Sequence, residues 1–166
     1  MRFSTISLPA LAALLPLTLA VANPSNGESS VGKAIVKNQC EFPVHLWSVG
    51  SEIGPRQTLD DRTGSYEEDI HRDPVSAGIA LKITLDENGL FNGSPQLIDA
   101  YTLDGNRVFY DLSSVFGNPF AGHRIVLDAT EPGCRDTVWE QGIRTAGALS
   151  TTDCVASTDL VLTLCA

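Results

Sequence analysis

The sequence is poor in the side chains that most often carry catalysis or hold a metal. Only three of its 166 residues are histidines, His45, His71 and His123, and no two of them are spaced as metal ligands. Its four cysteines include no Cys-x-x-Cys pair of the kind that binds zinc. No Gly-x-Ser-x-Gly elbow marks a serine hydrolase. We therefore predict a protein that is not an enzyme, with no catalytic residue, no metal site and no cofactor.

Basic residues are scarce as well. The chain carries 11 lysines and arginines against 20 aspartates and glutamates, a net charge of −9. Because phosphate backbones and anionic lipids bind basic patches, this balance predicts that nucleic acid is not a partner and favours a neutral or cationic one. Glycoside hydrolysis uses a pair of carboxylates, and many such pairs can be chosen among 20 acidic residues. The abundance of acidic residues alone is therefore no evidence for that activity.

Long apolar runs are absent beyond the N-terminus. The first 22 residues combine Arg2, an apolar run over residues 8–19 and the triplet Ala-Val-Ala, which is the pattern of a secretory signal peptide cleaved before Asn23. A membrane anchor is the alternative, but Pro16 interrupts the run. No later stretch approaches the roughly 20 apolar residues of a spanning helix. We predict a secreted, extracellular protein without membrane insertion.

The rest of the chain divides into a short leader and one domain. Residues 23–32 are small and polar, which predicts a flexible leader. Residues 33–166 have a length that suits a single domain.

Short strand-like runs recur through this domain. Residues 33–38 and 43–49 are rich in β-branched and aromatic side chains and flank a turn-like segment at Cys40, which predicts an N-terminal β-hairpin. Similar runs occupy residues 57–59, 123–128 and 159–166. The spacing of these runs, with turn residues between them, predicts an all-β fold built as a two-sheet sandwich.

Two turn signals predict further hairpins in the middle of the domain. Residues 79–85 place apolar side chains on one face, and the Asn-Gly step after them predicts a turn into a returning strand at residues 90–91. Residues 96–103 and 107–112 flank an Asp-Gly-Asn turn and are expected to pair with each other.

The segment from residue 65 to residue 73 concentrates charge. It holds four carboxylates beside a histidine and an arginine, namely Glu67, Glu68, Asp69, Asp73, His71 and Arg72. Acid–base catalysis and divalent-cation binding are both open to that composition. However, adjacent side chains of a strand point to opposite faces, and no calcium-loop pattern follows. We favour a solvated strand edge whose inward residues are Tyr66 and Ile70.

Several other features have both a structural and a functional interpretation. Asn92 begins an Asn-Gly-Ser sequon that can be glycosylated, although a turn is the simpler interpretation. Residues 134–150 are expected to form an irregular excursion with one helical turn. Exposed aromatic rings can stack on sugars, but core packing is the favoured role for five aromatic residues, namely Trp47, Trp139, Tyr66, Tyr101 and Tyr110.

The four cysteines of an exported chain are expected to form two disulfides. They are Cys40, Cys134, Cys154 and Cys165. Four cysteines allow three connectivities, and spacing alone does not choose among them.

Two blocks of sequence resemble thaumatin-like proteins. The first runs from residue 33 to Trp47 and consists of a short strand, Asn-x-Cys, an aromatic residue and a hydrophobic run. The second comprises residues 97–103, Val-Phe-Tyr-Asp-Leu-Ser at residues 108–113 and Gly-Asn-Pro-Phe at residues 117–120, and looks like the family's central strand pair and its Asp-x-Ser turn. Length and cysteine count narrow the resemblance to the small fungal antigenic thaumatin-like proteins, the CalA and CetA group.

This resemblance implies a fold and a role. The family pairs its first cysteine with one near the C-terminus, which implies Cys40–Cys165 and leaves Cys134 to pair with Cys154. The implied fold is a thaumatin-like antiparallel β-sandwich with two disulfides and little helix. The implied protein is associated with the cell wall, cell surface or spore surface and acts in spore germination, wall morphogenesis, antigenicity or host adhesion. Cell-wall glucan or a host cell-surface protein is then its partner, and we expect a monomer.

The acidic cleft of plant thaumatin-like proteins is matched only in part. Asp111, beside Tyr110, stands where the family places one acidic residue of the cleft. Ala100 replaces the glutamate of the preceding strand, with Asp99 as its neighbouring stand-in, and Phe116 replaces the next aspartate. A weak β-1,3-glucan-binding or glucan-hydrolysing protein that uses Asp111, Asp99 and Tyr110 is therefore the alternative function.

For Asp111 itself the sequence favours a structural role. A carboxylate just after a strand can accept hydrogen bonds from the turn that follows, so Ser113 and Ser114 are its expected partners.

Overall fold

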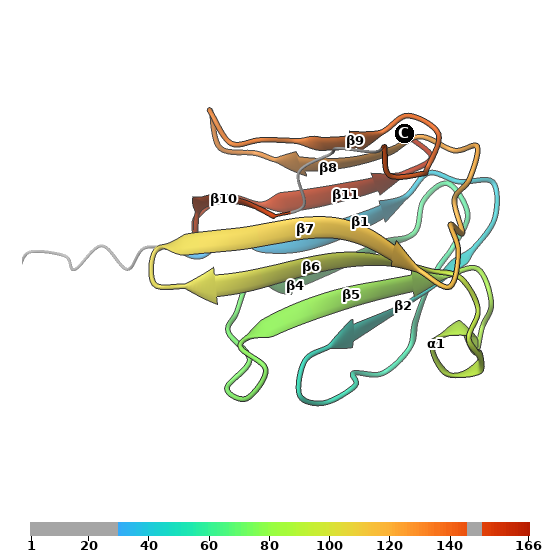
Figure 1. Ribbon diagram of the computed structural model, residues 1–166, viewed down its shortest axis with the longest axis horizontal. Coiled ribbons are helices and arrows are strands. Elements are labelled where there is room, and N and C mark those ends of the chain that lie inside the picture. Colours follow the sequence, from blue (N-terminus) through green and yellow to red (C-terminus); the bar gives the residue numbers. More distant parts are fainter. Residues whose placement is uncertain (1–29, 146–150) are drawn as a thin grey trace, which may run out of the picture.

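Two β-sheets packed face to face form the protein (Figure 1). The computed structural model describes residues 30–145 and 151–166. The signal peptide predicted for residues 1–22 and most of the predicted leader lie outside the described residues. Within the described part, the one helix is the single turn α1 (Gly89–Asn92). The prediction of an all-β sandwich with little helix is confirmed.

Each sheet combines segments that lie far apart in the sequence. The five-stranded sheet has the order β4 (Ser65–Asp69), β1 (Lys33–Asn38), β11 (Leu160–Leu164), β8 (Ile125–Ala129) and β9 (Thr137–Trp139). The six-stranded sheet has the order β10 (Thr152–Val155), β7 (Arg107–Val115), β6 (Gln96–Asp104), β5 (Gly78–Thr84), β2 (Val44–Val49) and β3 (Gln57–Leu59).

The first and last strands of the fold are neighbours. β1 and β11 pair in parallel, with Ala34 opposite Leu160 and Asn38 opposite Leu164, and Figure 1 shows them side by side. Just beyond this pair, Cys40 and Cys165 form a disulfide with their Cα atoms 5.0 Å apart. The pairing implied by the family resemblance is confirmed.

The N-terminal hairpin predicted for residues 33–38 and 43–49 is wrong. Both segments are strands, but β1 belongs to one sheet and β2 to the other. Asn38, which is 1% exposed, organises the crossing. Its amide nitrogen donates hydrogen bonds to three carbonyl groups, those of Phe42 at 2.9 Å, Leu59 at 3.1 Å and Asp60 at 3.0 Å. These bonds satisfy backbone acceptors at the points where the chain leaves β1 and β3.

The segment after β5 also departs from the prediction. Residues 90–91 belong to α1 instead of a returning strand, and β5 pairs with β6. α1 lies against the end of β5, and the two are in close contact at Gly89. A Cβ atom added at Gly89 would lie 2.5 Å from the Thr84 hydroxyl oxygen. The alternation predicted for β5 holds for Ile79, Leu81 and Ile83, which are buried, whereas Leu85 lies outside the strand and is exposed.

The central hairpin of β6 and β7 confirms the Asp-Gly-Asn turn. Asp104 pairs with Arg107, and Gly105 has a φ of 59°, which glycine adopts at little cost. The excursion predicted for residues 134–150 contains β9 in its described part where a helical turn was expected, and residues 146–150 lie outside the described residues. Trp139 is 1% exposed and anchors this segment in the core, as predicted.

The second disulfide joins the two sheets. Cys134 lies between β8 and β9, and Cys154 lies in β10 of the other sheet, with a Cα–Cα distance of 5.6 Å. The pairing of Cys134 with Cys154, the two cysteines that remain once Cys40 pairs with Cys165, is therefore confirmed.

Removing the two disulfides separately should have unequal effects. The Cys40–Cys165 disulfide closes a separation of 125 residues and Cys134–Cys154 one of 20. On the loop-entropy model, replacing both cysteines by serine should lower the free energy of unfolding by about 5 kcal/mol for the first pair and about 3 kcal/mol for the second. Denaturant unfolding of the two double variants measures this, and a larger loss for the shorter loop would contradict it.

Candidate functional site

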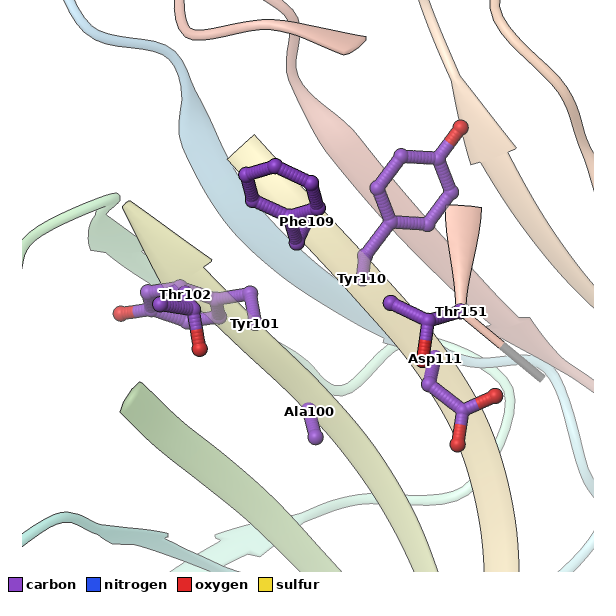
Figure 2. A pocket seen from close by; sticks show the side chains of 7 residues that line it. All are labelled: Ala100, Tyr101, Thr102, Phe109, Tyr110, Asp111 and Thr151. Atoms are coloured by element: carbon purple, nitrogen blue, oxygen red, sulfur yellow. The ribbon is translucent and has the colours of Figure 1, made fainter. Parts of the chain in front are cut away.

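A shallow hollow of about 270 Å³ lies on the outer face of β6 and β7 (Figure 2). Its exposed lining comes from alternate residues of the two strands together with Thr151, which precedes β10. Ala100 lies directly across from Asp111, and its small side chain leaves the space open. Phe109, which is 37% exposed, forms one wall. The hollow thus brings together a carboxylate, two threonine hydroxyls and an aromatic ring.

Asp111 lies inside β7 and not after it. The strand continues to Val115, so no turn follows Asp111 at Ser113 and Ser114. The Ser114 hydroxyl donates instead to the Asn118 side chain at 2.8 Å. The turn hydrogen bonds predicted for Asp111 are therefore wrong, because β7 is longer than its sequence pattern suggested.

Asp99 and Tyr110 point away from this hollow, into the sandwich. Strand alternation puts them on the inner face, where each is 1% exposed. The Tyr110 hydroxyl donates to the Arg135 carbonyl at 2.7 Å. Of the three residues predicted for the cleft, only Asp111 faces outward. Asp99 does not take the place of the glutamate that Ala100 replaces, because the two neighbours face opposite sides of β6.

The carboxylate chemistry of the hollow is correspondingly limited. Asp111 is the one acid among its described lining residues. The nearby Asp153 forms an ion pair with Arg107. Phe116, at the place of the family's next aspartate, is 70% exposed after the end of β7. Glycoside hydrolysis by a carboxylate pair needs two such groups about 5–9.5 Å apart across the substrate, an arrangement not found among these lining residues.

A partly buried polar cluster at the β4 edge of the sandwich was not predicted from the sequence. Glu68 of β4 accepts hydrogen bonds from the hydroxyls of Tyr66 at 2.6 Å and Tyr101 at 2.5 Å. Burial, together with Glu68, raises the pKa of both phenols. Burial, with further contributions from Glu68 and Asp111, raises the pKa of Asp99 to about 7. A clue was available in the alternation of β4, which turns Glu68 to the same side as Tyr66.

The rest of the acidic segment behaves largely as a strand edge. Residues 65–69 form the edge strand β4, Tyr66 is partly buried and Ile70 is 1% exposed, as predicted. Asp73 is the exception, since it is buried and accepts bonds from the backbone N–H groups of Ser51, Val75 and Ser76 at 3.0, 2.9 and 2.6 Å. These bonds hold the pKa of Asp73 well below its usual range. The Asp-Pro-x-Ser sequence at residues 73–76 is a turn signal that pointed to this role.

The structure also bears on the glycosylation sequon, on metal binding and on the aromatic residues predicted for the core. Asn92 is exposed at the end of α1, where its side-chain oxygen accepts hydrogen bonds from the Ser94 backbone N–H and hydroxyl. The described residues contain no group of three or more His, Cys, Asp or Glu side chains placed to hold a metal ion. They also contain no helix that is long and apolar enough to cross a membrane. Four of the five aromatic residues predicted to pack in the core are buried, namely Trp47, Trp139, Tyr101 and Tyr110.

Comparison with known proteins assigns the chain to a family. Residues 21–166 match the family model described as Blastomyces yeast-phase-specific protein, Bys1. The chain belongs to the Bys1 family. It is 30% identical over 172 residues to an antigenic thaumatin-like protein of Arthroderma benhamiae, covering 98% of this chain and 82% of that relative. The predicted membership in the small fungal thaumatin-like group is therefore confirmed.

A solved structure supports the same assignment for the fold. The Bys1-family chain is similar to the protein elicitor MoHrip2 from Magnaporthe oryzae, with a TM-score of 0.66 and 26% identity over 81% of this chain and 99% of that one. Of these two fungal proteins, one is thus named as antigenic and the other as an elicitor.

The buried Asp99 should make the stability of the protein fall as pH rises. In the unfolded chain this carboxyl ionises near pH 4, whereas the folded protein holds the proton to about pH 7. Between these values the folded state binds more protons, so its free energy of unfolding decreases with increasing pH, by up to about 4 kcal/mol. Asp99→Asn should remove this dependence and be more stable than the unmodified protein at pH values above about 7.

Denaturant unfolding at a series of pH values measures this effect. Asp69→Asn, which changes an exposed acid on the outward face of β4, is the matched control and should keep the dependence. Equal pH profiles for the unmodified protein and Asp99→Asn would contradict the assignment to Asp99.

Proposed function

We propose that this Bys1-family protein is a secreted fungal surface protein that acts by being bound, without catalysing a reaction. The observation that carries the proposal is the separation of the candidate cleft residues. Asp111 faces outward beside Ala100, and Asp99 faces the interior. A cleft with paired catalytic carboxylates is therefore not assembled from the residues at which the family resemblance would place it.

Display at the wall or spore surface is the setting that we propose. Two disulfides suit the oxidising environment outside the cell. Relatives named as an antigen and an elicitor are proteins that a host detects, which supports contact with a host. Roles in spore germination, wall morphogenesis, antigenicity or host adhesion fall within this proposal, with a host cell-surface protein or wall glucan as partner.

Immunolocalisation tests the setting directly. With an antibody raised against the folded domain, we expect staining of intact cells or spores and recovery of the protein from a wall fraction. Recovery solely from the cytosolic fraction would contradict the proposal.

Weak glucan binding at the hollow is the second candidate. Its support is the combination of the Phe109 ring, on which a sugar can stack, with the Asp111 carboxylate and the hydroxyls of Thr102 and Thr151 as hydrogen-bonding groups. Phe109 in this lining is exposed to solvent, so a polysaccharide chain has access to its ring.

Incubation of the purified protein with insoluble β-1,3-glucan separates the possibilities. We expect no release of reducing sugar, because a second catalytic carboxylate is not among the described residues that line the hollow. If glucan sediments the protein, Phe109→Ala should reduce the bound fraction severalfold, whereas the exposed control Asp61→Asn should not. Release of reducing sugar that is lost in Asp111→Asn would overturn the non-catalytic proposal.

Asp111 should contribute little to stability. Its side chain makes none of the turn hydrogen bonds expected from the sequence, and it is only partly buried on the outer face of β7. Asp111→Asn should therefore change the free energy of unfolding by less than about 0.5 kcal/mol, as is usual for surface substitutions. Thermal or denaturant unfolding measures it, and a loss of about 2 kcal/mol would restore a structural role for this carboxylate.

A further inference from the structure

Asp99 is a buried carboxyl group for which the described residues provide no hydrogen-bond partner. The residue is 1% exposed, and both of its side-chain oxygens are unpaired. On the neighbouring strands it lies directly across from Leu81 and Leu112, which are apolar. Ionisation is unfavourable in such surroundings, because no donor or cation replaces the lost hydration. Any movement that admits water to Asp99 therefore favours its ionised form.

Glu68 connects this carboxyl group to the edge of the other sheet. Glu68 belongs to β4, and its hydrogen bond from Tyr101 of β6 fastens β4 to the six-stranded sheet. The same carboxylate disfavours ionisation of Asp99 through charge repulsion. An ionised Asp99 consequently repels the carboxylate of Glu68, which links β4 to the six-stranded sheet.

The other titratable groups around this cluster do not offset a charge on Asp99. Tyr66 and Tyr101 donate to Glu68, and burial raises their pKa values, so they remain neutral through the neutral range. Asp111, on the opposite face of β7, adds a second negative charge. His71 lies at the margin, with its Nδ1 atom 3.2 Å from the Tyr101 hydroxyl and 2.9 Å from the Asp69 carbonyl oxygen.

β4 is also the strand of this region that can detach with the smallest loss of pairing. It lies at the edge of its sheet and, among the described strands, pairs with β1 alone, from Lys33 opposite Asp69 to Lys37 opposite Ser65. By contrast, β1 itself is paired on both sides, with β4 and β11. Detaching β4 would move Glu68 away from Asp99 and open the space between the sheets to water.

We propose that β4 is a pH-controlled flap, which detaches from the sandwich when Asp99 ionises and returns when Asp99 is protonated. Detachment uncovers the edge of β1, whose N–H and C=O groups can then pair with another strand. The protein is therefore closed in acidic surroundings and has an increasing open population as the surroundings become alkaline.

Site-resolved hydrogen exchange on the full exported chain tests this proposal. Exchange is measured at about pH 5.5 and about pH 8, on either side of the range in which a buried carboxyl group of this kind titrates, and is corrected for the intrinsic pH dependence of exchange. We expect the protection of the amides shared by β4 and β1 to fall more than tenfold at the higher pH, because opening there is coupled to loss of a proton. Protection in β8, on the far side of the same sheet, should stay higher than that of β4 at both pH values, because exchange there requires unfolding of the whole sheet and therefore reports the global stability.

Three variants identify the group responsible. Asp99→Asn keeps a polar side chain of the same shape without its charge, and should abolish the fall in β4 protection. His71→Gln and Asp69→Asn each remove another titratable group at this edge, and both should retain the fall. A fall that persists in Asp99→Asn, or that disappears in His71→Gln, would overturn the proposal. Equal protection of β4 and β8 at the higher pH would do so too, because it would indicate that β4 is released only by global unfolding and not as one strand.

Discussion

The parallel pairing of β1 with β11 is the contact on which the five-stranded sheet depends. β11 lies at the centre of that sheet, with β1 on one side and β8 on the other. Its inward residues Leu160, Leu162 and Leu164 are fully buried, and the Cys40–Cys165 disulfide closes the end of the pair. Without β11 the sheet would divide into the pair β4 and β1 and the pair β8 and β9, and neither pair alone could cover the apolar face of the six-stranded sheet.

The candidate site depends on a second constraint, the alternation of side chains along β6. Ala100 and Asp99 are neighbours in sequence, yet one borders the outer hollow and the other lies between the sheets. A shift of one residue in the pairing of β6 would exchange them and would place two acids on the outer face. The nine residue pairs between β6 and β7, which run from Gln96 opposite Val115 to Asp104 opposite Arg107, prevent such a shift. The register of one hairpin thus decides which acids of this Bys1-family protein can meet a ligand and which are shielded from it.

Local patterns in the sequence were sufficient to predict the strands that alternate or end in a strong turn signal, such as β5 and the β6–β7 hairpin. The family resemblance supplied both disulfides. What local patterns could not supply was the partner of each strand. The crossing between β1 and β2 depends on Asn38, whose amide binds the carbonyl groups of Leu59 and Asp60, more than twenty residues away. The half-buried position of Glu68 likewise depends on Tyr101, which comes from the other sheet. Contacts of this kind exist only once both sheets have assembled, so composition and spacing carry little information about them.

The central place of β11 also bears on how the protein can be made. Synthesis proceeds from the N-terminus, so β11 is the last of the described strands to emerge from the ribosome. Until it arrives, β1 lacks its inner neighbour and Cys40 lacks its partner, which leaves the chain without a complete core. Such a chain cannot complete its fold during most of its synthesis. The arrangement that ties the two ends of the fold together would therefore delay completion of the fold until synthesis is almost finished, and would couple the final step of folding to formation of the Cys40–Cys165 disulfide.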